Sequence, residues 1–346
     1  GEWRGGAPAH GNLSVHTQGR PAPALRRTLS YYVFHPKSPL PVRTTRPALA
    51  LLAAGALTVA CNGDRPKTSF DGTTALGYVK TQLAFGPRIP NSIGAQRCGD
   101  WIVAQMKTRA DTVIEQRFDH VTVKGDTLHL RNILARIHPE AAQRVLYVTH
   151  WDTRPISDSD PDPSKRKLPI AGANDGASGV ALFLGLGDAL KKTPATVGVD
   201  LLFVDGEDYG EFDGVMKDVL LGSTYFASHQ PSTAYRPLYG VLWDMIGDKD
   251  LDIYQEPNSM QRAPEVVSLV WNAAQELGYS KYFIPSPSNT GVTDDHIPLL
   301  DAGIHTIDVI DFDYPPHHTQ GDTIDKVSAR SLQIVGDVAT ALVTSK

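Results

Sequence analysis

Cysteine is scarce in this chain, which has only Cys61 and Cys98 among its 346 residues. Two isolated cysteines without a CxxC pair cannot build a disulfide framework or a cysteine-ligated zinc ribbon. Any metal site must therefore use histidine and carboxylate ligands. Such ligands are typical of catalytic zinc, which keeps one coordination position open.

The chain also lacks an apolar run long enough to cross a membrane. Its longest apolar stretch is RPALALLAAGALTVAC at 46–61. A transmembrane helix needs about 20 apolar residues. Upstream basic residues, this apolar core and the Ala60-Cys61 pair instead resemble a bacterial lipoprotein signal peptide. Thr58 stands where that pattern usually has Leu, and the alternative is an uncleaved apolar helix. We expect lipidation at Cys61, a periplasmic or extracellular location in the cell envelope, and membrane contact only through this anchor.

Runs of lysine and arginine are missing as well. The formal net charge is −5, and it becomes −11 once residues 1–60, with seven basic residues and one acidic residue, are removed. An acidic protein without a basic patch binds nucleic acid poorly, because contacts with the phosphate backbone dominate such binding. We expect no nucleic-acid partner, and we take a monomer as the simplest oligomeric state.

The chain divides into an N-terminal part without sustained apolar periodicity and one larger domain. Residues 1–61 hold an upstream extension and the signal peptide, and 62–70 are interpreted as a polar tether. Residues 71–346 are expected to form a single domain, because a chain of this length can bury a sizeable core.

Short apolar runs alternate with helical patterns in this domain. The runs are rich in Val, Leu and aromatic residues and nearly free of charge, which is typical of parallel strands buried on both faces. They lie at 145–149, 199–204 and 239–246, with further strand patterns at 111–119 and 128–138 and helical spacing at 72–86, 93–110, 176–191, 263–277 and 328–344. The pattern predicts an α/β fold with a mostly parallel sheet.

Potential metal ligands follow the apolar runs: His150, Asp175, the Glu207-Asp208 pair, Asp244 and His318. In open α/β sheets the ligand crevice lies beyond the carboxyl ends of the strands, so one crevice can collect these side chains. Imidazole and carboxylate together suit zinc. For each residue alone the alternative is a structural role, such as a helix cap. The acidic loop 157–167 also allows a calcium site, although solvated turns usually have this composition.

Several motifs occur in an order that matches a known superfamily: GANDGASG, DGED, LLGSTYFA, LWDMIGD, TDDHIPLLDAGI and HHT. From about Phe85 to Ala341 the chain resembles the zinc aminopeptidases of metallopeptidase family 28 and their relatives, the glutaminyl-peptide cyclotransferases. The resemblance implies a single three-layer α/β/α catalytic domain with a mixed, mostly parallel central sheet. It also implies peptide or protein N-termini as substrates.

Two features resemble the cyclase branch more than the aminopeptidase branch. TDDHIPLL at 293–300 is similar to the cyclase motif in which an acid pair precedes His-Ile-Pro, and 209–221 is longer than the corresponding aminopeptidase segment. Two departures remain. His317 occupies the position of a Trp in animal cyclases, and their cysteine pair is missing. A non-catalytic binding lipoprotein is a third possibility, because a fold alone does not prove function.

The resemblance assigns roles to the candidate residues. For a cyclase it implies one zinc ion held by Asp175, Asp208 and His318, with Glu207 as general base and acid. Asp294 and Asp244 then hold Glu207 or the reacting amide, and Asp295 is the weaker candidate for this role.

For an aminopeptidase the resemblance implies two zinc ions. His150 and Asp244 complete the second site, and Asp175 bridges the two ions.

The substrate pocket is expected to be walled by Trp151, Trp243, Phe312, Tyr314, His317 and the segment 209–221.

Overall fold

The computed structural model describes residues 67–212 and 214–345. The expected upstream extension, the signal peptide with Cys61 and the first part of the tether lie outside these ranges. Among the described residues, none of the helices combines the length and the apolar character needed to cross a membrane.

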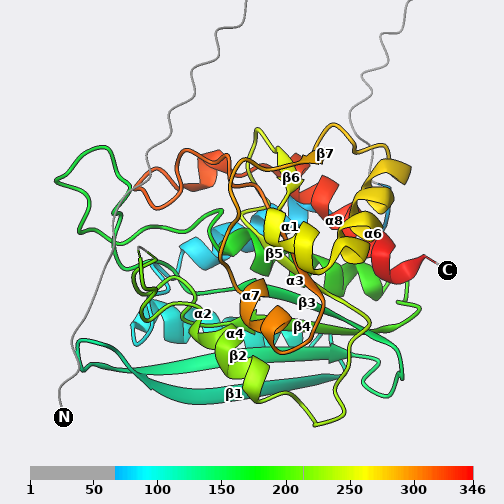
Figure 1. Cartoon of the computed structure of the whole chain (residues 1–346), viewed down its shortest axis with the longest axis horizontal. Helices are drawn as coiled ribbons and strands as arrows, with labels where there is room; N and C mark the ends of the chain where they lie inside the picture. Colours follow the sequence, from blue (N-terminus) through cyan, green and yellow to red (C-terminus); the bar gives the residue numbers. More distant parts are fainter. Residues whose placement is uncertain (1–66, 213, 346) are drawn as a thin grey trace, which may run out of the picture. The chain divides into compact units, whose positions relative to one another are not determined.

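A six-stranded mixed sheet forms the centre of the domain (Figure 1). Its spatial order is β1 (Thr112–Val121), β2 (Thr127–Ile137), β4 (Gly198–Val204), β3 (Arg144–His150), β5 (Gly240–Asp244) and β8 (Thr306–Ile310). The last four strands in this order are parallel to one another, and β2 runs antiparallel to both β1 and β4. The predicted mixed, mostly parallel sheet is confirmed.

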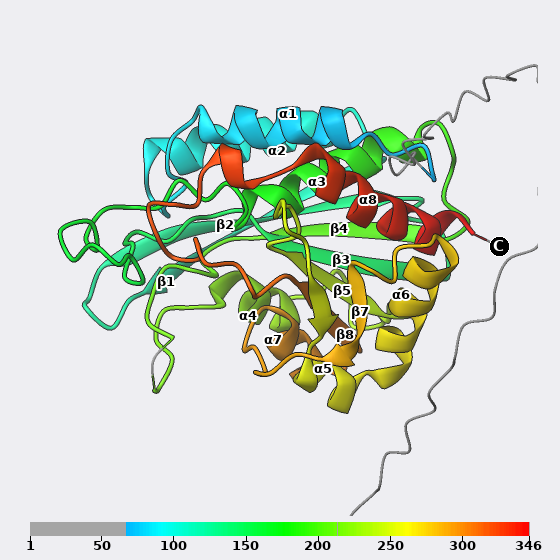
Figure 2. The same cartoon turned by 90° about the horizontal axis from the view of Figure 1, so that it is seen from above.

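Helices cover both faces of this sheet (Figure 2). One layer contains α1 (Gly72–Leu83), α2 (Ile93–Met106), α3 (Ala177–Leu190) and α8 (Ala329–Thr344), and the other contains α4 (Leu221–Ser228) and α7 (His296–Asp301). Beside β8 lie α5 (Pro257–Arg262), α6 (Pro264–Glu276) and a small parallel sheet of β6 (Ile253–Gln255) and β7 (Phe283–Pro287). A short helical turn, η1 (Ile324–Lys326), precedes α8.

The core consists of two apolar layers, because the central strands are buried on both faces. Alternation along β3 directs Tyr147 to the α3 side, where it packs against Phe183 and Trp243. The neighbouring Leu146 and Val148 belong to the opposite cluster. Each fully buried large apolar side chain contributes on the order of 1.5–3 kcal/mol.

The chain just before α1 is fixed to the domain. The backbone amides of Lys67 and Thr68 donate hydrogen bonds to Asp337 at 3.0 and 2.9 Å. Phe70 is buried, and its ring lies against Gly185 and Gly336 on two helices. The expected tether is therefore wrong for residues 67–70, because one apolar side chain and two amide donors are enough to dock this segment.

Candidate metal centre and active site

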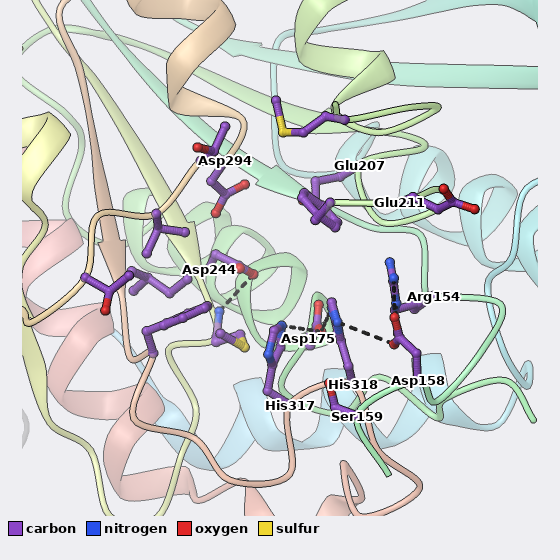
Figure 3. Close-up of a pocket in the computed structure, with 18 of the residues that line it drawn as sticks. Arg154, Asp158, Ser159, Asp175, Glu207, Glu211, Asp244, Asp294, His317 and His318 are labelled. Atoms are coloured by element: carbon purple, nitrogen blue, oxygen red, sulfur yellow. Dashed lines mark hydrogen bonds and ion pairs between the residues drawn. The ribbon is translucent and has the colours of Figure 1, made fainter. Parts of the chain in front are cut away.

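The carboxyl ends of the parallel strands meet at one edge of the sheet and bring most of the candidate residues together. His150 ends β3 and Asp244 ends β5, while Glu207 follows the end of β4 and Asp175 precedes α3. The segment between β8 and α8 brings His318 to the same place. Figure 3 shows Asp175, Glu207, Asp244, Asp294 and His318 around one cavity.

Asp175 lies at the centre of this cluster. Its Oδ1 is 3.1 Å from His150 Nε2, and its Oδ2 is 3.7 Å from His318 Nε2 and 4.0 Å from His317 Nε2. Two groups of donor atoms therefore share Asp175. They are Asp175, His317 and His318, and His150, Asp175 and Asp244, with the donor atoms in each group within 4.8 Å of one another.

Asp208 reaches this cluster through His318. Its Oδ1 lies 3.2 Å from His318 Nε2, and the same oxygen accepts a hydrogen bond from Arg154 Nη1 at 3.0 Å. His317, expected only as a pocket wall, has its Nε2 4.0 Å from Asp175 Oδ2 and belongs to one group of donor atoms with Asp175 and His318. The assignment of Asp175, Asp208 and His318 as one ligand set stays a prediction, and His317 is a competing donor.

The donor set fits a zinc ion. Asp175 Oδ2, Asp208 Oδ2 and His150 Nδ1 are buried and have no hydrogen-bond partner among the described residues. Buried polar atoms are rarely left unpaired, because an unmade hydrogen bond costs about 1–3 kcal/mol. Imidazole nitrogen and carboxylate oxygen are ligands that zinc accepts.

Two glycines make room for this cluster. A Cβ on Gly176 would lie 2.5 Å from His150 Nε2, so only glycine lets the imidazole approach the start of α3. Gly206 has a φ of +71°, a left-handed conformation that turns the chain between β4 and Glu207. The motifs GANDGASG and DGED thus carry backbone requirements as well as carboxylates.

Two aspartates that the sequence did not single out hold the backbone of the ligand loops. Asp152 accepts hydrogen bonds from the amides of Glu207 and Asp208, both at 3.2 Å. Asp322 accepts bonds from the amides of Asn174 and Asp175 at 2.9 and 3.3 Å. Their proximity in sequence to His150 and His318 was the available signal.

Arg154 was also missed, and Tyr314 has a different role from the expected one. The guanidinium of Arg154 joins Asp208 to Asp158, with a distance of 2.6 Å between Arg154 Nη2 and Asp158 Oδ2. Tyr314 is buried and donates its hydroxyl to Asp322 Oδ1 at 2.7 Å. It supports the loop that carries Asp175 and does not wall the cavity.

Glu207 and Asp294 are buried carboxyls that face the same cavity. Burial raises the pKa of Glu207 well above its usual value; Asp208 and Asp294 add to this effect, and His150 opposes it. Burial and the nearby Asp244 raise the pKa of Asp294 in the same direction. Carboxyls with raised pKa values can exchange protons near neutral pH, as general acid–base catalysis requires.

Asp295 points away from the cavity. Its Oδ1 accepts a hydrogen bond from Ser223 Oγ at 2.5 Å, and burial raises its pKa to about 7. Its backbone amide donates to Asp294 Oδ1 at 2.6 Å. The structure therefore places Asp294, and not Asp295, at the cavity surface.

The paired histidines have opposite electrostatic environments. Burial and the charge of His318 lower the pKa of His317 to about 4. Burial also disfavours protonation of His318, but Asp208 and Asp175 outweigh it and raise the pKa of His318. His317 is therefore neutral near pH 7, the form in which imidazole binds metals.

The cavity has a volume of about 720 Å³, and its wall combines acidic and polar side chains with the apolar side chains of Ile156, Phe212, Met216, Val292 and Phe312. The expected wall residues Phe312 and His317 line it, as does part of the segment 209–221. Pockets of this size hold small ligands and bury most of their surface.

Trp151 and Trp243 do not line this cavity, which corrects the sequence-based expectation. Trp243 belongs to β5, where alternation turns its side chain into the core against Tyr147. Trp151 is buried, and its Nε1 donates to the carbonyl oxygen of Arg131 at 3.1 Å. Core packing accounts for both rings.

The sequence pattern of peptidase family M28 matches residues 132–343, which contain all the candidate site residues described above. The chain belongs to peptidase family M28. This result confirms the resemblance found in the motifs, and it places the chain among enzymes rather than non-catalytic binding proteins.

Relatives in both branches of the family are similar to this chain. A glutaminyl cyclase structure from Bacteroides thetaiotaomicron is 34% identical, with a TM-score of 0.77 over 80% of this chain and 98% of that one. A leucine aminopeptidase precursor from the same species is also 34% identical, with a TM-score of 0.78 over 82% of this chain and 99% of that one. Aminopeptidase YwaD of Bacillus subtilis is 24% identical over 97% of this chain and 69% of its own length.

Proposed function

We propose that this protein is a zinc-dependent glutaminyl-peptide cyclotransferase, which converts an N-terminal glutamine to pyroglutamate and releases ammonia. The observation that carries the proposal is the position of Asp294. This buried carboxyl lines the cavity together with Glu207 and Asp244. In the cyclase mechanism Asp294 holds Glu207 or the reacting amide, and its place in the cavity wall beside Glu207 and Asp244 fits this role.

The residues of the chain divide the work between holding a metal and moving a proton. Asp175, Asp208 and His318 would hold zinc, which supplies a Lewis acid for the γ-amide carbonyl of the substrate. Glu207 accepts a proton from the substrate α-amine as that nitrogen forms a bond to the γ-carbonyl carbon. It then delivers the proton to the amide nitrogen, which leaves as ammonia when its bond to the same carbon breaks.

Asp244 and Asp294 position the reacting groups in this scheme. Both can accept hydrogen bonds from the α-amine or the amide nitrogen, because both face the cavity beside Glu207. No water molecule is consumed in the reaction.

A paired assay tests the proposal. The zinc-loaded protein is incubated with Gln-initiated peptides, with ammonia as the readout, and separately with a leucine anilide, with aromatic amine as the readout. Ammonia together with an N-terminally blocked peptide supports the cyclase. Release of amine without ammonia contradicts it.

A zinc aminopeptidase is the second candidate, and one observation favours it. His150, Asp175 and Asp244 form a second group of donor atoms that shares Asp175 with the first. Two ions bridged by one carboxylate would clamp a water nucleophile, which Glu207 would deprotonate. A zinc content of two ions per chain would support this alternative. Asp244→Asn should then lose one of the two ions together with its activity.

We also propose that the protein is anchored in the cell envelope through a lipid on Cys61. The basic residues, apolar core and Ala60-Cys61 pair of the sequence support this proposal. Mass spectrometry of the N-terminal peptide from the membrane fraction tests it, with Cys61→Ser as the control. An unmodified Cys61 in a chain that still starts upstream of residue 60 would contradict it.

A further inference from the structure

A second cavity adjoins the active-site cavity and shares part of its wall. Its volume is about 260 Å³, and both cavities are lined by Thr290, Val292, Ile310 and Phe312. Four common wall residues mean that the two spaces lie side by side, with the second cavity on the side of the small β6–β7 sheet.

One chain segment walls both spaces in succession. Residues 286–290 line the second cavity, and 290–294 line the active-site cavity up to Asp294. This segment leads from β7 to α7 (Figure 1). It forms a continuous path from the proposed catalytic carboxyl to the second cavity.

Hydrogen bonds fix this segment in place. The amide of Val292 donates to Glu256 Oε1 at 3.0 Å, and Asn258 Nδ2 donates to the carbonyl oxygen of Val292 at 2.9 Å. Farther along, the amide of Ser288 donates to the carbonyl oxygen of Gln255 at 2.9 Å. A groove with a fixed wall can bind an extended peptide without first ordering a loop.

The combined groove is acidic. Among the described residues, Glu256 and Asp313 are the charged ones that line the second cavity, and none of its lining residues is a lysine or arginine. Arg154, which lines the active-site cavity, is paired with Asp158 and Asp208. Asp313 is exposed and forms no ion pair with a described residue.

We propose that the two cavities form one groove for the first three residues of a peptide substrate, with a preference for a basic residue after the first. The first residue occupies the active-site cavity with its α-amine near Glu207 and Asp294. The following residues lie along 286–293 toward Asp313. The reaction at the first residue rests on the proposed function, whereas binding of the following residues in the groove does not.

Peptide length provides the first test. We expect kcat/KM for ammonia release to rise roughly tenfold from Gln-Ala to Gln-Ala-Lys-Ala, about the effect of burying one further side chain. Asn289 is exposed where it lines the second cavity. Asn289→Trp should fill that cavity and abolish the gain while Gln-Ala turnover stays unchanged, and Asn289→Ala is the matched control. Equal turnover of short and long peptides, or an equal loss for both in Asn289→Trp, would overturn the proposal.

Charge provides the second test. We expect Gln-Ala-Lys-Ala to be preferred over Gln-Ala-Glu-Ala by roughly two- to fivefold, the range of an exposed ion pair. Asp313→Lys should reverse this order, and Asp313→Asn should remove most of it. An unchanged preference in Asp313→Lys would contradict the assignment of this groove.

A binding measurement separates this inference from the proposed reaction. The affinities of fluorescently labelled forms of the same peptides for zinc-loaded Glu207→Gln are measured by anisotropy, with no turnover required. If no Gln-initiated peptide releases ammonia but the length and charge dependence of binding remains, the cyclase fails and the groove stands. If ammonia is released but neither dependence exists, the cyclase stands and the groove fails.

Discussion

Glu207 is the residue on which the proposed proton transfer depends most directly. It faces the cavity, and neither group of donor atoms that share Asp175 includes it. Glu207→Gln should therefore keep its zinc and lose activity by roughly 100-fold or more, as expected for removal of a general acid–base. Zinc content and ammonia release are measured on the same preparation, and loss of zinc in this variant would refute the assignment.

His318 has the opposite expected behaviour, because its Nε2 lies between Asp175 and Asp208. His318→Ala should lose zinc and activity together. His317→Phe is the informative comparison, since it keeps an aromatic wall but removes the competing donor nitrogen. We expect this variant to retain zinc, whereas zinc loss equal to that of His318→Ala would make His317 a ligand.

The expected ligand residues can be picked out from the sequence, but the residues that support their loops cannot. Asp175, Asp208 and His318 occur in motifs that resemble a known family, and the structure brings them together. Asp152 and Asp322 act by accepting backbone amides from other loops. Such contacts join residues far apart in the chain, and the one local signal is that Asp152 and Asp322 lie near His150 and His318 in the sequence.

At the scale of an element, Glu256 caps α5 and also holds the groove wall. Its carboxylate accepts bonds from the amides of Asn258 and Ser259, and from the amide of Val292. Burial opposes its ionisation, but the nearby His296, whose Nε2 lies 3.4 Å from Glu256 Oε2, and these helix amides outweigh burial and lower the pKa of Glu256 to about 2.

This depressed pKa predicts a pH-dependent contribution to stability. The folded pKa of about 2 lies below the usual 4.5, so the contribution is complete above about pH 4.5 and is lost as the pH falls toward 2. Glu256→Gln should lower the free energy of unfolding by roughly 1–2 kcal/mol near pH 7, the usual effect of losing a cap. Urea unfolding at about pH 7 and about pH 3 checks this, because the difference between the two proteins should shrink at the lower pH. A constant difference would contradict the role of the ionised carboxylate.

The long and strongly patterned elements are predictable, and the short ones are not. The apolar runs at 145–149 and 199–204 correspond to β3 and β4, because strands buried on both faces need uninterrupted apolar residues. The run at 239–246 overestimates β5, since Met245 leaves the strand with a φ of +46°. The sequence does not reveal β8, where the buried Asp308 interrupts a short apolar run.

At the scale of the whole molecule, the sequence predicts the layered fold and the edge of the sheet that carries the site. The parallel strands β3, β4 and β5 end at that edge. The polar residues at or just after their carboxyl ends must therefore meet there. The pocket walls are harder to predict, because they depend on which way each side chain turns. Trp243 points into the core, whereas Phe312 reaches the cavity from a loop.

Mass spectrometry of a single reaction tests the central claim most directly. The zinc-loaded protein is given a Gln-initiated peptide in water labelled with heavy oxygen, and the peptide product is weighed. The cyclase account predicts a peptide that has lost only the mass of ammonia and contains no heavy oxygen, since the α-amine and not water attacks the amide. A peptide shortened by its N-terminal glutamine, with heavy oxygen in the released amino acid, would contradict this account and identify an aminopeptidase.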